Sequence, residues 1–322
     1  MRKLRVGLLS WAHVHAPGLV AALSALEQVD YIGSFDDSGS PHTGRTHATL
    51  DALLRECEAV VIASTNAGHH RYTLAAARAG VHVLCEKPLA TTIPDAAAMI
   101  EACRAAGVQL GVALPVRSSP TVIALRESIQ NGALGRVRAV RATNPGQYPG
   151  GWFGDPIEAG GGAAMDHTVH VADALRWLLT DEVVRVHAEL GSFLYALPVE
   201  DCGVLTLDFA GGAFATIDCS WSRPATYPTW GGVTMHVVGE RGTVDIDVFR
   251  QSLTHYDDTS GKTRLAGWGD DLTALTIAGF VDAILGGRPV PISGEDGLRS
   301  LEVVAAAYRS AELRRPVETS EV

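Results

Sequence analysis

The chain has 322 residues, a length that suits two domains better than a single hydrophobic core. Hydrophobic residues make up 47% and charged residues 19%, which is typical of a globular protein with ample material for a core. The net charge of -10 is unfavourable for binding nucleic acid or an anionic membrane, so a small-molecule ligand is expected instead.

The five cysteines predict a reduced protein. Their number is odd and none lies in C-x-x-C spacing, so neither a disulfide framework nor a metal motif is indicated. The N-terminal stretch MRKLRVGLLS is basic and then apolar, but its apolar run is too short for a signal peptide or a membrane span. We therefore expect a cytoplasmic protein without a membrane segment.

The chain begins with the pattern of a strand, a turn and a helix. Residues 4–9 are apolar like a buried strand, and residues 17–26 place small and apolar side chains at helical spacing. A dinucleotide-binding turn has the pattern G-x-G-x-x-G here, because glycine lets the backbone approach the pyrophosphate. Ser10, Ala12 and His15 stand where the three glycines are expected, so the motif itself fails.

The residues of this turn still suit a phosphate. Ser10 and Ala12 are small, the Ser10 hydroxyl can donate a hydrogen bond, and backbone N–H groups at the start of the helix point towards an anion. If protonated, His13 or His15 would add positive charge, and cofactor affinity would weaken as the pH rises through the histidine titration. The alternative is that both histidines only pack against neighbouring loops.

Two acidic residues follow the second apolar run, residues 29–35. Asp36 lies where a carboxylate accepts hydrogen bonds from an adenosine ribose, and Asp37 adds negative charge. A 2′-phosphate would be repelled there, so NAD is predicted over NADP, with NADP possible if Arg45 swings in. An acidic residue at a strand end is also common without a ligand.

Small and polar residues follow the third apolar run, residues 59–63. Ser64, Thr65, Asn66 and His69 lead into a helical pattern, a context that suits an anion or a ribose. A plain N-terminal cap is the alternative.

The fourth apolar run, residues 81–85, leads into Glu86, Lys87 and Pro88. Open parallel sheets bind ligands at this end of their strands, and a lysine there can exchange a proton with a substrate hydroxyl. Pro88 biases the backbone of Lys87 away from the helical region and so aims the side chain reproducibly. A loop with a surface ion pair is the alternative interpretation.

Strands alternate with helices up to about residue 114, which predicts a doubly wound parallel sheet. After residue 117 the pattern changes, and a glycine-rich loop over residues 145–154 carries Tyr148, Trp152 and Phe153. These aromatic side chains either cover a substrate or form a satellite hydrophobic cluster. We assign Tyr148 and Trp152 to the substrate.

A long helical pattern over residues 163–179 carries Asp166, His167 and His170. Asp166 and His170 are four residues apart and share a face, where an acid and an imidazole can orient a sugar hydroxyl and move its proton. His167 lies beside them and is assigned to the substrate. A metal site would need further ligands that the sequence does not place, so no metal is predicted; a capping aspartate with a core histidine is the other alternative.

From residue 184 onward, alternating runs separated by glycine turns predict an antiparallel sheet. Closing helices are expected over residues 271–285 and 297–311, and the tail from residue 314 is expected to fray. No repeat or linker marks a domain border, which rests on the change of pattern alone.

Three segments in this order make the chain recognisable. VVIASTNAGHH resembles an A-T-P-N-x-x-H turn, VHVLCEKPLA an E-K-P segment and GGGAAMDHTVH a G-G-G-x-x-x-D-x-G-x-H helix. Together they resemble the Gfo/Idh/MocA family of NAD(P)-dependent sugar and inositol oxidoreductases over essentially the full length. The chain departs from the family at the glycine turn, at Thr65, where proline is usual, and at Thr168, where the helix has glycine.

The resemblance implies an α/β chain with two domains: a dinucleotide-binding Rossmann domain over residues 1–118 and an α+β domain over residues 119–322. The second domain would carry a large, mostly antiparallel open sheet, bind the substrate and build a homodimer or homotetramer. Combined with the residues above, the resemblance assigns catalysis to Lys87, Asp166 and His170, the substrate to Lys87, Tyr148, Trp152 and His167, and NAD to Ser10, Ala12, His13, Asp36, Ser64, Thr65, Asn66, His69, Glu86 and Lys87.

The predicted activity is hydride transfer between nicotinamide and a secondary hydroxyl of a sugar, inositol or related polyol. Lys87 would transfer the proton, with His170 as its partner or an alternative base and Asp166 orienting the hydroxyl. The enzyme alternative is a redox-neutral lyase, hydrolase or epimerase with tightly bound NAD. The non-enzyme alternative is a dinucleotide or sugar sensor, since a fold does not fix a function.

Overall fold

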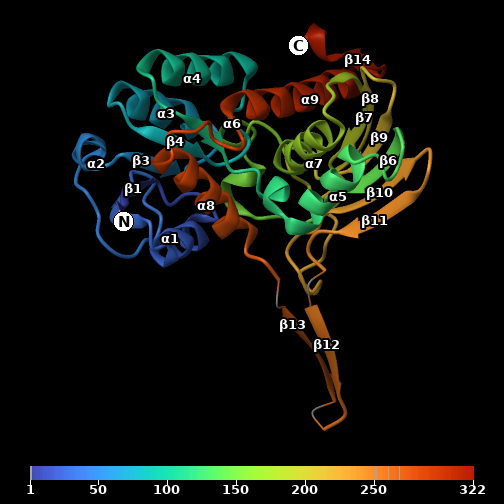
Figure 1. Cartoon of the computed structure of the whole chain (residues 1–322), viewed down its shortest axis with the longest axis horizontal. Helices are drawn as coiled ribbons and strands as arrows, with labels where there is room; N and C mark the ends of the chain where they lie inside the picture. Colours follow the sequence, from blue (N-terminus) through green and yellow to red (C-terminus); the bar gives the residue numbers. More distant parts are fainter. Residues whose placement is uncertain (1, 251, 260, 268) are drawn as a thin grey trace.

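The computed structural model describes residues 2–250, 252–259, 261–267 and 269–322. Figure 1 shows two halves side by side, one built on a parallel sheet and the other on a larger sheet, with a two-stranded hairpin projecting away from both. None of the helices in these ranges is long and apolar enough to cross a membrane.

The first sheet is parallel throughout, which confirms the predicted fold. Its strands are β1 (Leu4–Leu9), β2 (Val29–Phe35), β3 (Ala59–Ile62), β4 (His82–Cys85) and β5 (Leu110–Val112). The strand order is β2-β1-β3-β4-β5, so the direction of winding reverses between β1 and β3. Ligands bind beyond the carboxyl ends of strands at such a switch point.

Helices follow the strands of this sheet. They are α1 (Ala16–Ala25), α2 (Leu50–Glu56), α3 (Gly68–Arg78) and α4 (Ile93–Ala106). Two of them, α2 and α4, begin at threonine caps. The short α2 is not among the predicted elements; it begins where the Thr49 hydroxyl accepts a hydrogen bond from the Ala52 amide at 3.1 Å.

The chain then crosses into the second half. The connecting elements are η1 (Pro115–Ser118), α5 (Pro120–Gln130), β6 (Val137–Thr143), η2 (Gly151–Gly154), α6 (Pro156–Ala159) and α7 (Ala163–Leu179). The helix α7 has the bounds that the sequence predicts, and it carries the predicted Asp166, His167 and His170.

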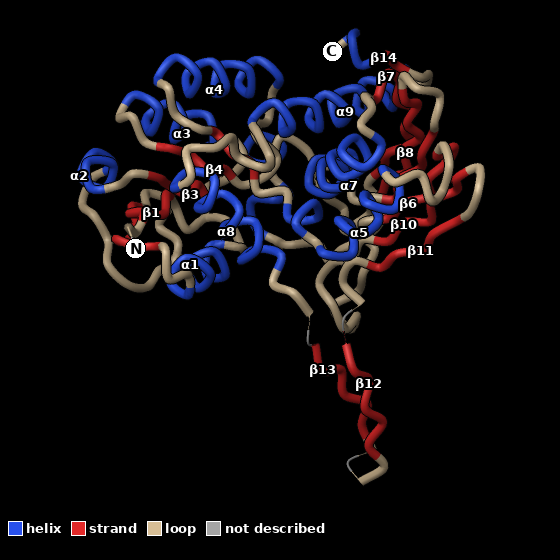
Figure 2. Tube along the Cα trace, viewed as in Figure 1, coloured by secondary structure: helices blue, strands red, loops and turns tan. Residues whose placement is uncertain are grey.

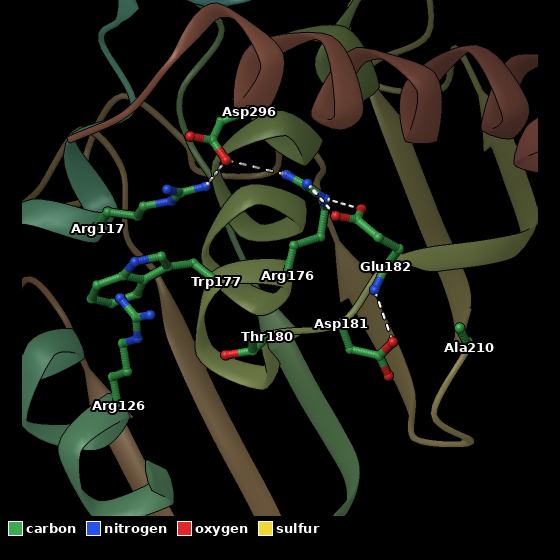
Figure 3. Close-up of a pocket in the computed structure, with 9 residues that line it drawn as sticks. All are labelled: Arg117, Arg126, Arg176, Trp177, Thr180, Asp181, Glu182, Ala210 and Asp296. Atoms are coloured by element: carbon green, nitrogen blue, oxygen red, sulfur yellow. Dashed lines mark hydrogen bonds and ion pairs between the residues drawn. The ribbon is translucent and has the colours of Figure 1, made fainter. Parts of the chain in front are cut away.

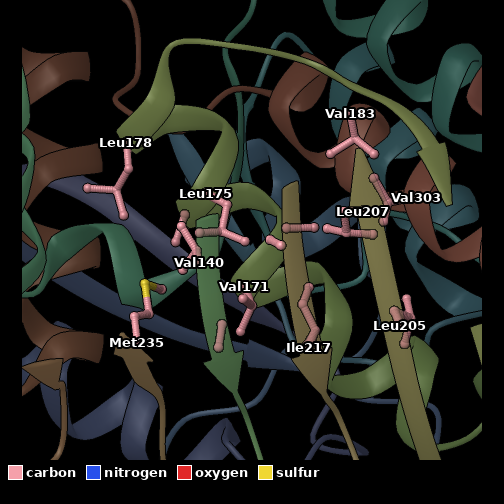
Figure 4. Close-up of a cluster of buried hydrophobic side chains, with 14 of the residues drawn as sticks. Val140, Val171, Leu175, Leu178, Val183, Leu205, Leu207, Ile217, Met235 and Val303 are labelled. Carbon is pink, nitrogen blue, oxygen red and sulfur yellow. The ribbon is translucent and has the colours of Figure 1, made fainter. Parts of the chain in front are cut away.

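The second sheet is mixed but mostly antiparallel, as expected. Its order is β11-β10-β6-β9-β8-β7-β14, and of these neighbours only β6 and β9 are parallel. Its other strands are β7 (Val183–Gly191), β8 (Cys202–Phe209), β9 (Phe214–Asp218), β10 (Thr234–Gly239), β11 (Thr243–Asp247) and β14 (Val317–Glu318). Val171 and Leu175 of α7 belong to the same buried core as Leu205 and Ile217 of the sheet (Figure 4).

The C-terminal tail is part of this sheet, so the expectation of a frayed end is wrong. Val317 and Glu318 pair with Val186 and Arg185 of β7, and the Val317 side chain is fully buried. A last turn, η3 (Thr319–Glu321), follows. An apolar side chain that fills a core position holds the end of the chain in place.

The helices α8 (Leu272–Leu285) and α9 (Gly294–Leu313) return to the first half. Ile277 and Phe280 of α8 are buried with β1 and α1 on one face of the parallel sheet, while Leu301 of α9 is buried with β3 and α4 on the other. A domain border at residue 118 stays a proposal; it separates the two sheets, but it assigns α8 and α9, which pack on the first sheet, to the second domain.

The strands β12 (Ser252–Asp257) and β13 (Lys262–Gly267) form a sheet of their own. Figure 2 shows them as a hairpin that stands clear of both halves.

Candidate active site

A cavity of about 440 Å³ lies between the carboxyl edge of the first sheet and the second half. Its walls come from the turn after β1, the loop after β4, the helix α7 and the chain before α8. It brings together five of the predicted site residues: His13, Lys87, Asp166, His167 and His170. A concave site with convergent titratable groups is the candidate active site.

Lys87 and Asp166 form a buried ion pair in this cavity. Lys87 Nζ lies 2.5 Å from Asp166 Oδ1, and the two side chains are only 4% and 9% exposed. Asp166 Oδ2 accepts a hydrogen bond from Trp221 Nε1 at 3.0 Å and lies 3.2 Å from His167 Nε2. Burial alone would raise the pKa of Asp166, but the charge of Lys87, together with these contacts, holds it far below its ordinary value.

Both oxygens of Asp166 are therefore occupied. The carboxylate holds Lys87 in place, and the role that the sequence analysis gave it, orienting a substrate hydroxyl, stays a prediction. Trp221, which fixes the carboxylate, was not among the predicted site residues.

His170 and His167 complete the wall formed by α7. Burial, followed by the nearby charge of Lys87, lowers the pKa of His170 well below its ordinary value, so the ring is neutral near pH 7. Its Nδ1 is buried and has no hydrogen-bond partner among the described residues. His167 Nδ1 lies 3.1 Å from the Cys219 carbonyl oxygen, which fixes the orientation of that ring.

In the turn after β1, a serine adopts the backbone conformation that glycine normally has at this position. Ser10 has a φ of 71°, in the left-handed region that glycine normally occupies. The Ser10 hydroxyl and the Trp11 N–H both donate to Asp36 Oδ1, at 3.1 and 2.7 Å, and so tie the turn to the end of β2. The Val14 N–H makes no hydrogen bond to a described residue, and Val14 lines the cavity. These features fit a dinucleotide, which needs this backbone and a free N–H for its phosphates.

The charged residues near Asp36 are paired with one another. Asp37 accepts two hydrogen bonds from Arg71, at 2.8 and 2.9 Å, and a further one from Tyr72. Arg45 pairs with Glu56 at 3.0 Å. Arg71 is thus the cation beside Asp37, and the sequence analysis named Arg45 instead.

The structure favours the packing alternative for His13 over a role as a positive charge. His13 is buried, and burial lowers the pKa of its ring well below the ordinary value, so the ring is neutral near pH 7. Its backbone N–H donates to Ala63 O at 2.9 Å, and its ring centroid lies 5.4 Å from that of Phe153. The His13 ring therefore packs against neighbouring groups, as the alternative interpretation expected.

Trp152 and Tyr148 lie outside the lining of the cavity. Trp152 Nε1 donates to the Ala12 carbonyl oxygen at 2.9 Å, which joins the second half to the turn after β1. The Tyr148 ring lies 5.0 Å from Trp221. Both side chains pack against a satellite hydrophobic cluster that contains Phe153. Their assignment to the substrate stays a prediction.

Asn66 and His69 brace the loops around the lysine. Asn66 Nδ2 donates to the Ala159 carbonyl at 2.8 Å, and His69 Nδ1 lies 2.8 Å from the Pro88 carbonyl oxygen. Asn66 Oδ1 and His69 Nε2 are buried without hydrogen-bond partners among the described residues. Burial lowers the pKa of His69 to about 4, so this ring is also neutral.

The hydroxyl group of Ser64, which precedes these residues, donates a hydrogen bond to the carbonyl oxygen of Thr65.

Asn144 is a further polar residue of the cavity, and the sequence analysis did not find it. Its Nδ2 donates to the Gly232 carbonyl at 3.0 Å, while its Oδ1 is buried without a hydrogen-bond partner among the described residues. That oxygen is an acceptor available to a substrate hydroxyl. Asn144 follows β6, far along the chain from the lysine, and no local pattern marks it.

A second cavity of about 380 Å³ contains none of the predicted site residues. Figure 3 shows Asp296 between Arg117 and Arg176, and Arg176 paired with Glu182. Arg126 lies over the ring of Trp177, with its guanidinium carbon 3.9 Å from the ring centroid. Because its three carboxylates match its three arginines in formal charge, this cavity is better explained by structural ion pairs than by catalysis.

Comparisons with known proteins agree with the fold. The sequence matches the "Oxidoreductase family, NAD-binding Rossmann fold" over residues 16–114 and the "GFO/IDH/MocA C-terminal domain" over residues 122–245. It is 30% identical to 1,5-anhydro-D-fructose reductase of Ensifer adhaerens, over 95% of this chain and 96% of that protein. It is also 30% identical to myo-inositol 2-dehydrogenase of Thermotoga maritima, over 82% and 80% of the two chains.

Among solved structures, GenD2 from gentamicin A biosynthesis, in complex with NAD, superposes with a TM-score of 0.88 at 27% identity. The match covers 99% of this chain and 97% of GenD2.

Proposed function

Since this chain belongs to the GFO/IDH/MocA oxidoreductase family, we propose that it transfers hydride between NAD and a secondary hydroxyl of a sugar, inositol or related polyol. The buried pair of Lys87 and Asp166 carries this proposal, because it faces a cavity at the carboxyl edge of a parallel sheet.

NAD, when bound, supplies the hydride chemistry. Ser10, Val14 and Asp36 would hold it: the left-handed turn and the free Val14 N–H suit the phosphates, and Asp36 suits the adenosine ribose. The negative charge of Asp36 disfavours the 2′-phosphate of NADP, whereas the charge of Asp37 is offset by Arg71.

Lys87 exchanges the proton of the reacting hydroxyl through Nζ. Asp166 fixes Nζ by the 2.5 Å contact, and the neutral His170 ring offers a lone pair that can take the proton onward. Asn144 Oδ1 accepts a hydrogen bond from a second hydroxyl and so favours a polyol over a simple alcohol.

We also propose a homodimer or homotetramer that forms through the second sheet. Val204 and Phe214 are 51% and 52% exposed on one face of the neighbouring strands β8 and β9. Light scattering would measure the mass, and a Phe214→Glu variant should shift it towards the monomer.

A panel of inositols, aldoses and anhydroketoses, each incubated with the protein and NAD or NADH, tests the activity. The proposal expects one equivalent of cofactor oxidised or reduced per substrate converted. Product without net change in the cofactor would indicate the redox-neutral lyase, hydrolase or epimerase. Binding without any product would indicate the sensor.

A further inference from the structure

We propose that His13, His15 and Glu86 form a binding site for one divalent transition-metal ion beside the lysine cavity. Each residue offers one ligand atom, and these atoms all lie within 4.8 Å of one another. In the described part of the chain, no other three or more His, Cys, Asp or Glu residues gather in this way.

The geometry needs only a small contraction to hold an ion. His15 Nδ1 already lies 3.1 Å from Glu86 Oε1, and the rings of His13 and His15 have centroids 4.5 Å apart. Ligand atoms of a tetrahedral zinc ion lie roughly 3.4 Å apart when each bond is about 2.1 Å. His15 is exposed at the N-terminal end of α1 and makes no side-chain cap there, so it is free to move the remaining distance.

The donors suit particular metals. Two imidazoles and one carboxylate favour Zn²⁺, Co²⁺ or Ni²⁺, whereas Mg²⁺ and Ca²⁺ prefer sites made of oxygen atoms. His13 Nε2 is buried and has no hydrogen-bond partner among the described residues, so in the tautomer that places the proton on Nδ1 its lone pair is available to a metal ion. The lone pair of the neutral His13 ring now accepts the backbone N–H of His15 at 3.1 Å, and His15 Nδ1 contacts Glu86 Oε1 at 3.1 Å. Metal binding would give up both of these contacts.

The two buried ligands are held from behind. The backbone N–H of His13 donates to Ala63 O, and the backbone N–H of Lys87 donates to Glu86 Oε2 at 3.2 Å. The first contact holds the backbone of the turn, and the second orients the Glu86 carboxylate, as outer contacts do for metal ligands. The ligands come from the turn after β1 and the loop after β4. The sequence analysis considered a metal only at the helix α7 and therefore did not predict this site.

The site opens on the cavity. Both histidines line it together with Lys87, so the remaining coordination position of a three-ligand ion would be open to a ligand in the cavity. There it would act as a Lewis acid on such an oxygen. The proposal does not rest on the proposed function, because metal binding is measured without NAD or substrate.

The test uses the tag-free, full-length protein after treatment with a chelator. Calorimetry with Zn²⁺ and the visible absorption of added Co²⁺ report the stoichiometry and the ligand field. We expect one ion per chain, and we expect His15→Ala to weaken binding by at least roughly 100-fold, since loss of an outer partner alone costs about 10–100-fold. Glu86→Gln should weaken it as well.

His236→Ala is the matched control. His236 Nδ1 lies 2.7 Å from Asp245 Oδ1 on the second sheet, a pair without a second histidine, so this variant should bind like the native protein. Thermal unfolding of each variant establishes that it is folded, and the exposed position of His15 makes its variant the safest. Absence of stoichiometric binding in the native protein, or equal affinity in the native and His15→Ala proteins, would overturn the proposal.

Discussion

Replacing Lys87 with methionine tests the buried ion pair and the proton transfer together. Methionine keeps most of the apolar length of the lysine but removes Nζ, and it leaves a buried Asp166 carboxylate whose remaining contacts are Trp221 and His167. Removing one partner of a buried ion pair costs about 3–5 kcal/mol of the free energy of unfolding. Losing one general acid or base costs about a hundredfold to ten-thousandfold in turnover.

The effect on stability should depend on pH with a defined sign. In the native protein the pKa of Asp166 lies below its unfolded value, so the pair contributes stability above that value and loses it as the pH falls. Without Lys87, burial is expected to raise the pKa of Asp166, so the penalty is present at neutral pH and is relieved when acid protonates the carboxylate. The stability gap between the two proteins should therefore close as the pH falls.

Denaturant unfolding at several pH values measures this gap, and steady-state kinetics with a verified substrate measures turnover. Adding Asp166→Asn to Lys87→Met removes the buried charge and should recover most of the stability but none of the turnover. The exposed Lys3→Met serves as the control. Near-normal turnover of Lys87→Met would refute the proton-transfer role, and an equally unstable double variant would refute the buried-charge explanation.

Three further changes test other parts of the structure. Asn144→Ala should raise the KM for the polyol about threefold to tenfold, the value of one hydrogen bond, and leave NAD affinity unchanged in calorimetry; an unchanged KM would exclude the contact. Asp36→Ala should weaken NAD binding about tenfold and reduce the preference over NADP, whereas tighter binding of NADP by the native protein would contradict the assignment. Burial raises the pKa of Asp173 to about 7 although Arg117 lies beside it, so its contribution to stability is complete below about pH 4 and is lost as the pH rises to 7. Asp173→Asn should flatten that decline in thermal unfolding, and an unchanged slope would assign it to other groups.

The sequence predicted those helices and strands that are determined by a pattern of neighbouring residues. The bounds of α7 could be predicted because helical periodicity runs without interruption from Ala163 to Leu179. The strand β14 could not, because two residues form a strand only by pairing with β7, more than a hundred positions earlier in the chain. The structure of the C-terminal tail therefore depends on its pairing with a distant strand.

The site divides in the same way. Lys87, Asp166 and His170 each lie in a short recognisable motif, and the structure brings all three to one cavity. Trp221 and Asn144 have no such motif, and only folding brings Asn144 to the cavity and Trp221 to Asp166. Burial, which the sequence does not state, also lowers the pKa of His13, and the contacts of Asp166 with Lys87 and Trp221 form only in the fold.

The return of α8 and α9 to the first half bears on how such a chain can be recombined. A gene fusion cut after residue 118 would separate the parallel sheet from Phe280 and Leu301, which are buried against its two faces. The isolated fragment would expose apolar surface on both sides and would be expected to aggregate. An exchange that transplants this half intact needs two breakpoints, one near residue 118 and a second before α8, so the cofactor half and the second sheet are inherited as interleaved rather than consecutive units.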